Sequence, residues 1–398
     1  MFNRFSYTVL FTIICTVSFG QKNEFDGVNF DTEVHSMNRF GFELFQEVTQ
    51  TDRNVIYSPF SLSVILSMLE NGSGGLTSGE ITGAIHLNDD RDERNEQYLA
   101  MFKYLAEDTL KNGAFEWANI VYLAREVESK EDYRGVLDEY YYSELENLDF
   151  STESVVTDKM QKWMGNTLNH EVAFEMEVAH VSRDVELLLA NTIHLNGDWK
   201  YAFEETPVID TFTTSNFHEI VTPYAKGVNY PIHLKLNPNH PNDSLFVFDF
   251  KGSLQLEVLF PSANDTLANI LERINTGYYN DFEGQGQLIV DTIYLPLLNL
   301  SEMNNMKAPL SEMGMSSAFS SQADFSEIAN GIMLEDVVHH GELLFGTSGA
   351  KETDKLYSQI EISTKEPFKV VKFNRPFVFF VKGERSDIFV FMGVVNRF

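Results

Sequence analysis

The chain has 398 residues, 43% of them hydrophobic, with 33 Phe and 16 Tyr. This is enough apolar material for one large domain or two ordinary ones, and because no Pro/Gly/Ser-rich linker or repeat divides the chain, we expect a single domain. The formal net charge is -30, from 29 basic and 59 acidic residues. Such an acidic surface repels nucleic acid and anionic membranes, so we expect neither as a partner.

The N-terminus has the pattern of a secretory signal peptide. Arg4 precedes a largely apolar run at residues 9–17, and the small residues Ser18 and Gly20 follow. The run is too short to span a membrane, so we expect cleavage after residue 20, a secreted extracellular protein, and a single domain over residues 21–398. The chain's one cysteine, Cys15, lies in the segment that would be removed, so the fold does not depend on disulfides.

Predicted helices dominate the first part of the chain, and predicted strands dominate the rest. Helical spacing occupies residues 33–50, 62–69, 78–112 and 156–170, and glycines at residues 71–75 end the second of these segments. Strand patterns occupy residues 54–57, 115–123, 185–195, 245–250, 254–260, 287–298, 371–381 and 391–396. This order predicts the α+β class. The charged run at residues 88–96 is interpreted as a solvated loop.

The sequence offers no convincing enzyme or metal site. Residues 346–350 resemble a nucleophile elbow, but Ala350 stands where that turn requires glycine. The adjacent His339 and His340 would point to opposite faces of a strand, and no cysteine joins them. We therefore expect a protein that is not an enzyme and holds no metal or cofactor, with His339 as a hydrogen-bonded core residue.

Four Asn-X-Ser/Thr sequons are candidates for glycosylation in a secreted chain, or else unmodified surface asparagines. They begin at Asn71, Asn242, Asn264 and Asn299. Asn71 is the weakest candidate, because it ends an apolar helix.

The polar stretch at residues 346–369 lies between two strand-like runs and is too polar to belong to a core. A segment held at both ends by buried strands is either disordered or an exposed functional loop.

Five motifs, in order along the chain, resemble one family, the serpins. They are residues 54–63, residues 191–199 followed by Phe203, Leu295-Pro296, Ala318-Phe319 with residues 323–326, and residues 371–381. The resemblance implies a serpin fold with three β-sheets, eight or nine helices and an exposed reactive-centre loop at about residues 349–369. It also implies membership of the serine-type endopeptidase inhibitor family, with a serine protease as partner.

The resemblance assigns roles to particular residues. Ser58, Ser61, Asn191 and His339 correspond to the family's shutter, the polar cluster that controls opening of the main sheet, and Trp199 corresponds to the breach. The hinge of the loop corresponds to Gly349, Ala350, Lys351, Glu352, Thr353 and Asp354. Two ways of counting place the reactive bond at Ser363-Thr364 or at Ile362-Ser363, and a shorter count reaches Lys365.

In trapping serpins the cleaved loop inserts as a strand, so alternate hinge residues must enter a buried face. If Ala350 is the first inward residue, the buried set also includes Glu352 and Asp354, whereas the opposite register buries Lys351, Thr353 and Lys355. Burying an unpaired carboxylate costs several kcal/mol. The charged hinge therefore predicts weak or absent trapping of the protease.

Two alternatives remain open. The protein could be a functional suicide inhibitor of an elastase-like or chymotrypsin-like protease, because Ile362 suits their pockets, while Lys365 would suit a trypsin-like enzyme. It could instead be a non-inhibitory carrier or interaction serpin.

Heparin binding is not expected, because residues 92–112 carry five acidic and three basic side chains. We expect a monomer.

Overall fold

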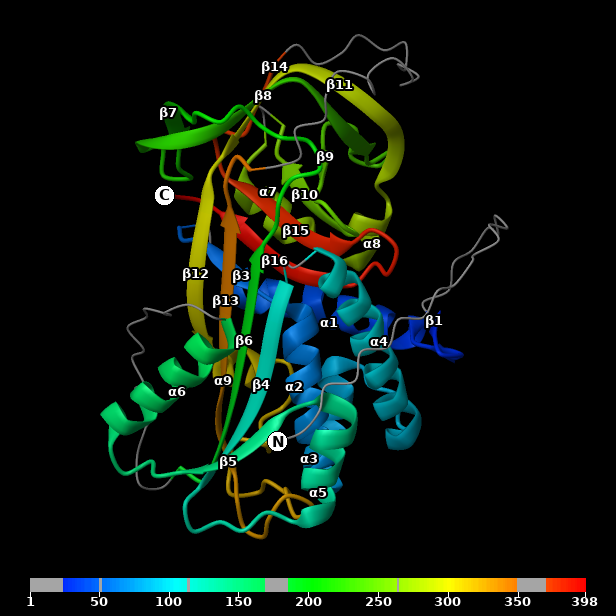
Figure 1. Cartoon of the computed structure of the whole chain (residues 1–398), viewed down its shortest axis with the longest axis vertical. Coiled ribbons are helices and arrows are strands. Elements are labelled where there is room, and N and C mark those ends of the chain that lie inside the picture. Colours follow the sequence, from blue (N-terminus) through cyan, green and yellow to red (C-terminus); the bar gives the residue numbers. More distant parts are fainter. Residues whose placement is uncertain (1–23, 50–51, 113–114, 169–184, 263–264, 349–369) are drawn as a thin grey trace.

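The computed structural model describes residues 24–49, 52–112, 115–168, 185–262, 265–348 and 370–398 (Figure 1). Nine α-helices lie in these ranges, and a π-helical turn, η1 (Leu137–Tyr141), continues α5. The helices are α1 (Asp31–Val48), α2 (Pro59–Asn71), α3 (Gly75–Ile85), α4 (Arg91–Asn112), α5 (Glu131–Val136), α6 (Glu153–Leu168), α7 (Leu267–Arg273), α8 (Thr276–Asn280) and α9 (Lys307–Glu312). Among the described residues, no helix combines the length and apolarity needed to cross a membrane.

The strands of the described residues form three sheets, so the predicted α+β class with three sheets and eight or nine helices is confirmed. A small sheet pairs β1 (Glu24–Phe25) with β2 (Val28–Asn29). A five-stranded sheet has the order β12 (Leu298–Asn305), β13 (Leu334–Phe345), β6 (Leu187–Asn196), β4 (Phe115–Ala124) and β5 (Glu144–Leu148).

The third sheet has nine strands. Its order is β14 (Val370–Lys372), β11 (Glu283–Pro296), β8 (Glu219–Leu236), β9 (Ser244–Asp249), β10 (Leu254–Phe260), β15 (Phe377–Gly383), β16 (Phe389–Val395) and β3 (Val55–Tyr57), and β7 (Val208–Thr213) pairs with β8.

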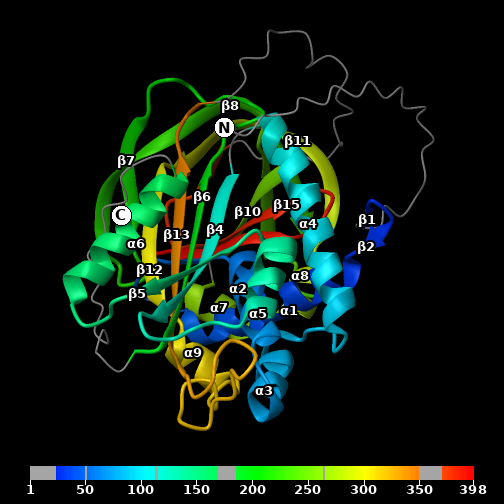
Figure 2. The same ribbon diagram turned by 60° about the horizontal axis from the view of Figure 1, so that its bottom comes forward.

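The centre of the five-stranded sheet is buried on both faces (Figures 1 and 2). Side chains of α6 pack on one face against Leu188 and Ala190 of β6 and Val338 of β13. On the other face α2 contacts β6 and β4. Double coverage explains why residues 187–195 are apolar at nearly every position rather than alternating.

Helix α2 lies between the five-stranded sheet and β16. It is buried from Pro59 to Glu70, as expected for a helix that is apolar on all sides. Ser58 caps its N-terminus, where the Ser58 Oγ accepts a hydrogen bond of 3.0 Å from the backbone N–H of Ser61. The cap fixes both serines beside the sheet.

The prediction of a solvated loop at residues 88–96 is wrong for most of that run. Helix α4 begins at Arg91, and Arg94 is fully buried. The guanidinium of Arg94 pairs with the buried carboxylate of Glu70, and Arg91 Nη2 lies 2.7 Å from Glu70 Oε1. We call Glu70, Arg91 and Arg94 the α4 cluster. It shows that this charge run includes residues that anchor a helix.

Candidate functional site

The predicted shutter residues meet at the joint between β6 and β13, which we call the seam. The two strands run parallel and are direct hydrogen-bonded neighbours, from Leu334 opposite Leu187 to Leu344 opposite Asn196. His339 lies opposite Asn191 in this register. Any strand inserted between β6 and β13 would have to break these pairs.

The structure brings together Ser58, Ser61, Asn191 and His339 on the face of the seam toward α2. His339 Nε2 accepts a 3.0 Å hydrogen bond from the backbone N–H of Ser58, so its Nδ1 carries the proton and donates to Asn191 Oδ1 at 2.7 Å. The Asn191 amide in turn donates to Ser61 Oγ at 3.0 Å and to Asn119 Oδ1 at 2.6 Å. Asn119, on β4, was not predicted from the sequence.

This hydrogen-bonded cluster is electrically neutral. His339 is fully buried, and burial, with a smaller effect from His340, lowers the pKa of His339 to about 3. The imidazole therefore stays neutral at physiological pH, in agreement with the acceptor role of Nε2. The seam is closed on this face by hydrogen bonds between uncharged groups.

The opposite face of the seam is also bridged by polar side chains that the sequence reasoning missed. His340 of β13 lies 3.0 Å from Thr192 Oγ1 on β6 and 3.1 Å from Ser301 Oγ on β12. One step further along, His194 Nδ1 lies 3.4 Å from Glu342 Oε2. The signal in the sequence was the pair of alternating polar residues, 192 and 194, in an otherwise apolar strand.

Trp199 lies where the chain leaves the seam. Its ring stacks on Phe250 at 4.6 Å between centroids and lies 5.1 Å from Phe345, the last residue of β13. The indole Nε1–H donates to the carbonyl of Gly346 at 2.9 Å. The backbone N–H of Trp199 donates to the carbonyl of Ser348 at 3.0 Å. Trp199 thus holds the segment that leads into the predicted loop.

At this end of the seam the core-facing side chains are apolar. Ile193 and Leu195 of β6 and Leu343 and Phe345 of β13 are all at most 2% exposed and belong to the main core. A strand entering here would place its inward side chains against hydrocarbon.

The other predicted residues are placed as follows. The hinge residues 349–354 and the reactive-bond candidates Ile362, Ser363 and Thr364 lie outside the described residues, and so does Asn264. Asn242 and Asn299 are exposed. Asn71 is half-buried, and its amide donates to Ser67, Asn95 and Tyr141, so attachment of a glycan there would break these bonds. Among the described residues, no group of three His, Cys, Asp or Glu is arranged to hold a metal.

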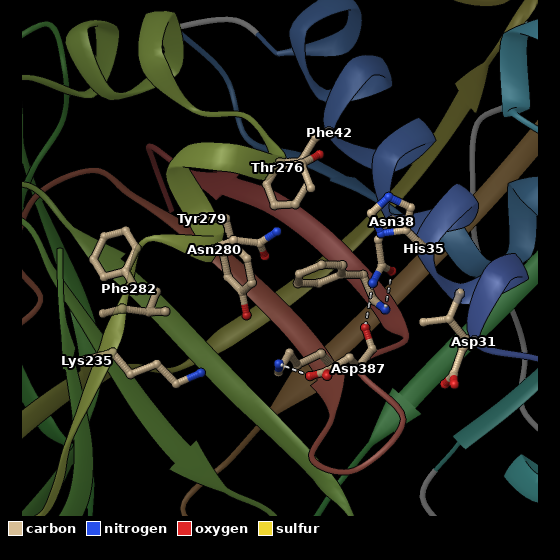
Figure 3. Close-up of a pocket in the computed structure, with 14 residues that line it drawn as sticks. Asp31, His35, Asn38, Phe42, Lys235, Thr276, Tyr279, Asn280, Phe282 and Asp387 are labelled. Carbon is tan, nitrogen blue, oxygen red and sulfur yellow. Dashed lines mark hydrogen bonds and ion pairs between the residues drawn. The ribbon is translucent and has the colours of Figure 1, made fainter. Parts of the chain in front are cut away.

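A pocket of about 340 Å³ lies between α1, α8 and the hairpin of β15 and β16 (Figure 3). Aromatic rings line it, including those of Phe42, Tyr279 and Phe282. Its two ammonium groups are each paired with a carboxylate, Lys235 with Glu257 at 2.6 Å and Lys382 with Asp387. Among the described residues that line the pocket, both ammonium groups are therefore neutralised by a carboxylate. We call this the α1–α8 pocket.

Together, the helix-covered five-stranded sheet and its closed parallel seam define an α+β class of proteins in which two long parallel strands, β6 and β13, are direct neighbours in the main sheet. The sequence profile of one such family, described as Serpin (serine protease inhibitor), matches residues 35–397. The chain belongs to the serpin family.

Relatives and solved structures agree with this assignment. The chain is 26% identical over 387 residues to Iripin-2 of Ixodes ricinus, covering 90% of this chain and 92% of that protein. It is 24% identical over 371 residues to an uncharacterized serpin-like protein of Thermococcus kodakarensis, covering 90% and 84%. The crystal structure of mouse protein-Z dependent protease inhibitor has a TM-score of 0.81 at 18% identity, covering 92% of this chain and 97% of that one.

Proposed function

We propose that this chain is a secreted serpin that offers residues 349–369 to a serine protease as bait, and that it traps the protease weakly or not at all. The observation that carries the proposal is the mismatch between the hinge and its receiving site. The hinge would bring Glu352 and Asp354 inward in the register that starts at Ala350. The seam would receive them among Ile193, Leu195, Leu343 and Phe345.

The cost of this mismatch decides between trapping and cleavage. Each unpaired carboxylate that enters an apolar face costs several kcal/mol, or else it must take up a proton. The cost slows insertion, and slow insertion gives the acyl-enzyme time to hydrolyse. The protease then leaves, and the serpin is consumed as a substrate.

Incubation with elastase-like, chymotrypsin-like and trypsin-like proteases tests the proposal. We expect cleavage within residues 349–369, no SDS-stable complex, and little gain in melting temperature after cleavage. A stable complex with any of the three would show that the chain is a working inhibitor and would identify the protease class. Sequencing the N-terminus of exported protein tests secretion, with Gln21 expected first.

A pair of double variants isolates the role of the hinge. Glu352→Ala with Asp354→Ala removes the inward carboxylates, and we expect it to form the complex and to gain melting temperature on cleavage. Lys351→Ala with Lys355→Ala is the matched control, because it removes the same number of charges from the other face. If both double variants behave like the parent chain, the hinge charges do not limit insertion.

A carrier function is a second candidate, supported by the α1–α8 pocket. Its volume falls within the range of small-molecule sites, and both aromatic and polar side chains line it. Native mass spectrometry of protein purified from its source would detect a bound small ligand. Protein that carries none, and that releases none on denaturation, would count against the carrier function.

A further inference from the structure

A second cavity, of about 550 Å³, lies next to the start of β15 in the nine-stranded sheet. It is formed by the turn at residues 214–218 between β7 and β8, by the start of α7, and by residues 374–376 before β15. Among the described residues, its walls combine apolar and polar side chains with one cation, Arg375, and one carboxylate, Asp265. They include Phe217, Pro261, Leu267, Asn374, Arg375 and Pro376. We call it the Arg375 cavity.

The guanidinium of Arg375 has no carboxylate partner among the residues that the structure describes. It makes one hydrogen bond, from Nη2 to the carbonyl of Pro261, and lies 4.1 Å above the ring of Phe260. Its Nε is buried and, within the described ranges, has no hydrogen-bond partner. Burial lowers the pKa of Arg375, and within the described residues only a carbonyl and an aromatic ring, but no carboxylate, offset this desolvation.

A neighbouring arginine, Arg273, differs from Arg375 because carboxylates pair with its guanidinium. Arg273, also half-buried, lies 2.8 Å from Asp243 Oδ2 and pairs with Asp265 as well. Asp265 lines the Arg375 cavity and shares Arg273 with Asp243, so these three groups together carry one negative charge. Arg375 is the only basic residue among the described residues that line the cavity, in a chain whose net charge is -30.

Phe217 supplies an independent observation at the same cavity. Its side chain is 86% exposed, and its backbone has a φ of 60°, in the left-handed region that favours glycine or asparagine in hairpin turns. A bulky aromatic residue in this conformation is rare and marks a strained position. A glycine here would relieve the strain and remove the exposed ring.

We propose that the Arg375 cavity binds a small amphipathic anion. Its carboxylate or sulfonate accepts hydrogen bonds from the Nη groups of Arg375, and its aromatic or aliphatic body is covered by Phe217, Pro261 and Leu267. The cavity volume is in the range of small-molecule sites. Planar guanidinium donors suit an oxyanion with two acceptor oxygens. This site differs from the α1–α8 pocket in its unpaired cation, and it exists whether or not the loop traps a protease.

Binding of 1-anilinonaphthalene-8-sulfonate to the full chain tests the proposal by fluorescence. Octanoate should displace this probe, and octan-1-ol, which has the same chain length without the charge, should displace it much less well. Arg375→Gln should weaken binding of the probe by about 10- to 100-fold, the range of a charge-assisted hydrogen bond. Equal displacement by the acid and the alcohol would overturn the role given to Arg375.

Phe217→Gly keeps the proposal testable if Arg375→Gln does not fold. We expect this variant to bind the probe several-fold more weakly while its melting temperature is unchanged or higher, because it relieves a strained residue. Val221→Ala is the matched control, since Val221 is 70% exposed on β8 but does not line the cavity. Unchanged binding in Phe217→Gly, or an equal loss in Val221→Ala, would place the anion elsewhere and overturn the proposal.

Discussion

Two buried polar clusters of this molecule are held together in different ways. Across the seam, His339, Asn191 and Ser61 are joined by hydrogen bonds between neutral groups. In the α4 cluster, full charges meet, because Glu70 pairs with Arg94 and Arg91 between α2 and α4. A neutral hydrogen bond contributes about 1 kcal/mol net and can be exchanged for another, whereas a buried ion that loses its partner costs several times as much.

The difference bears on the strand insertion considered under the proposed function. The seam is a joint that strand insertion would open, and each broken hydrogen bond there can be remade to an incoming strand or to water. The α4 cluster fixes one helix to another and cannot exchange its partners without burying a bare charge. The two clusters should also respond to pH in opposite directions, because one contains a buried base and the other lies beside a buried acid.

The largest expected effect is that of breaking the ion pair in Arg94→Ala. This variant leaves Glu70 buried with Arg91 as its remaining partner, and we expect a loss of about 3 kcal/mol or more in the free energy of unfolding. Urea unfolding measures it. The control is Arg39→Ala, which removes an exposed i,i+4 pair with Glu43 and should cost less than about 0.5 kcal/mol. Similar losses in the two variants would erase the distinction between the clusters.

The next largest effect is the pH dependence of the free energy of unfolding that Glu33, near the α4 cluster, should cause. Glu33 lies on α1 and is 1% exposed. Burial raises its pKa to about 7, against opposing effects of Arg94 and of a backbone hydrogen bond from Asn88. The folded state therefore holds a proton that the unfolded state has released, and stability falls as pH rises from about 4.5 to 7.

Glu33→Gln should remove this loss. Above pH 7 the variant should be more stable than the parent by about 2–3 kcal/mol, and below pH 4.5 the two should be equal. Chemical unfolding at a series of pH values measures the difference. Glu47→Gln, at an exposed position of the same helix, should leave the pH profile unchanged. A constant difference across the pH range would mean that Glu33 does not titrate in this window.

The seam should show a smaller loss and the opposite response to pH. His339→Ala leaves the Ser58 N–H and the Asn191 amide without their partner, which should cost about 1–3 kcal/mol at pH 7. Hydrogen exchange at β6 and β13 should become faster.

Because burial lowers the pKa of His339 to about 3, the parent chain loses stability as pH falls from 6.5 toward 3, and the variant lacks this loss. The two curves should converge in acid. Parallel curves would show that His339 does not carry this pH dependence, and His35→Ala, at an exposed histidine, is the control.

The seam was easier to foresee from the sequence than the α4 cluster. Ser58, Ser61, Asn191 and His339 lie in motifs that resemble a known family, and the structure brings all four together. Even there, Asn119 escaped notice, because its partner on β6 is set by strand register and not by proximity in the sequence.

The α4 cluster was not predicted, because the charge of a segment can be counted along the sequence, whereas the burial of its side chains depends on the tertiary fold. Residues 88–96 are rich in charge, but Arg94 shares a helical face with Tyr98, Met101 and Leu105, all of them buried. That spacing was present in the sequence, and it marks Arg94 as the one charge of the run that points inward. The carboxylate that pairs with Arg94 is that of Glu70, at the end of the apolar α2. No pattern in the sequence indicates that these two residues meet.

The smallest expected effect is at the end of the seam, where a substitution can remove one hydrogen bond of Trp199 while keeping its ring stacking. Trp199→Phe keeps an aromatic ring against Phe250 but loses the indole N–H that donates to Gly346. We expect a cost of about 1 kcal/mol and faster hydrogen exchange in residues 341–348, with the rest of β13 unchanged. Trp163→Phe, on α6, is the control and should not alter exchange in residues 341–348. If Trp199→Phe instead loosens the whole seam as much as His339→Ala does, then the seam opens as one unit from its end, and the hydrogen bonds around His339 depend on Trp199.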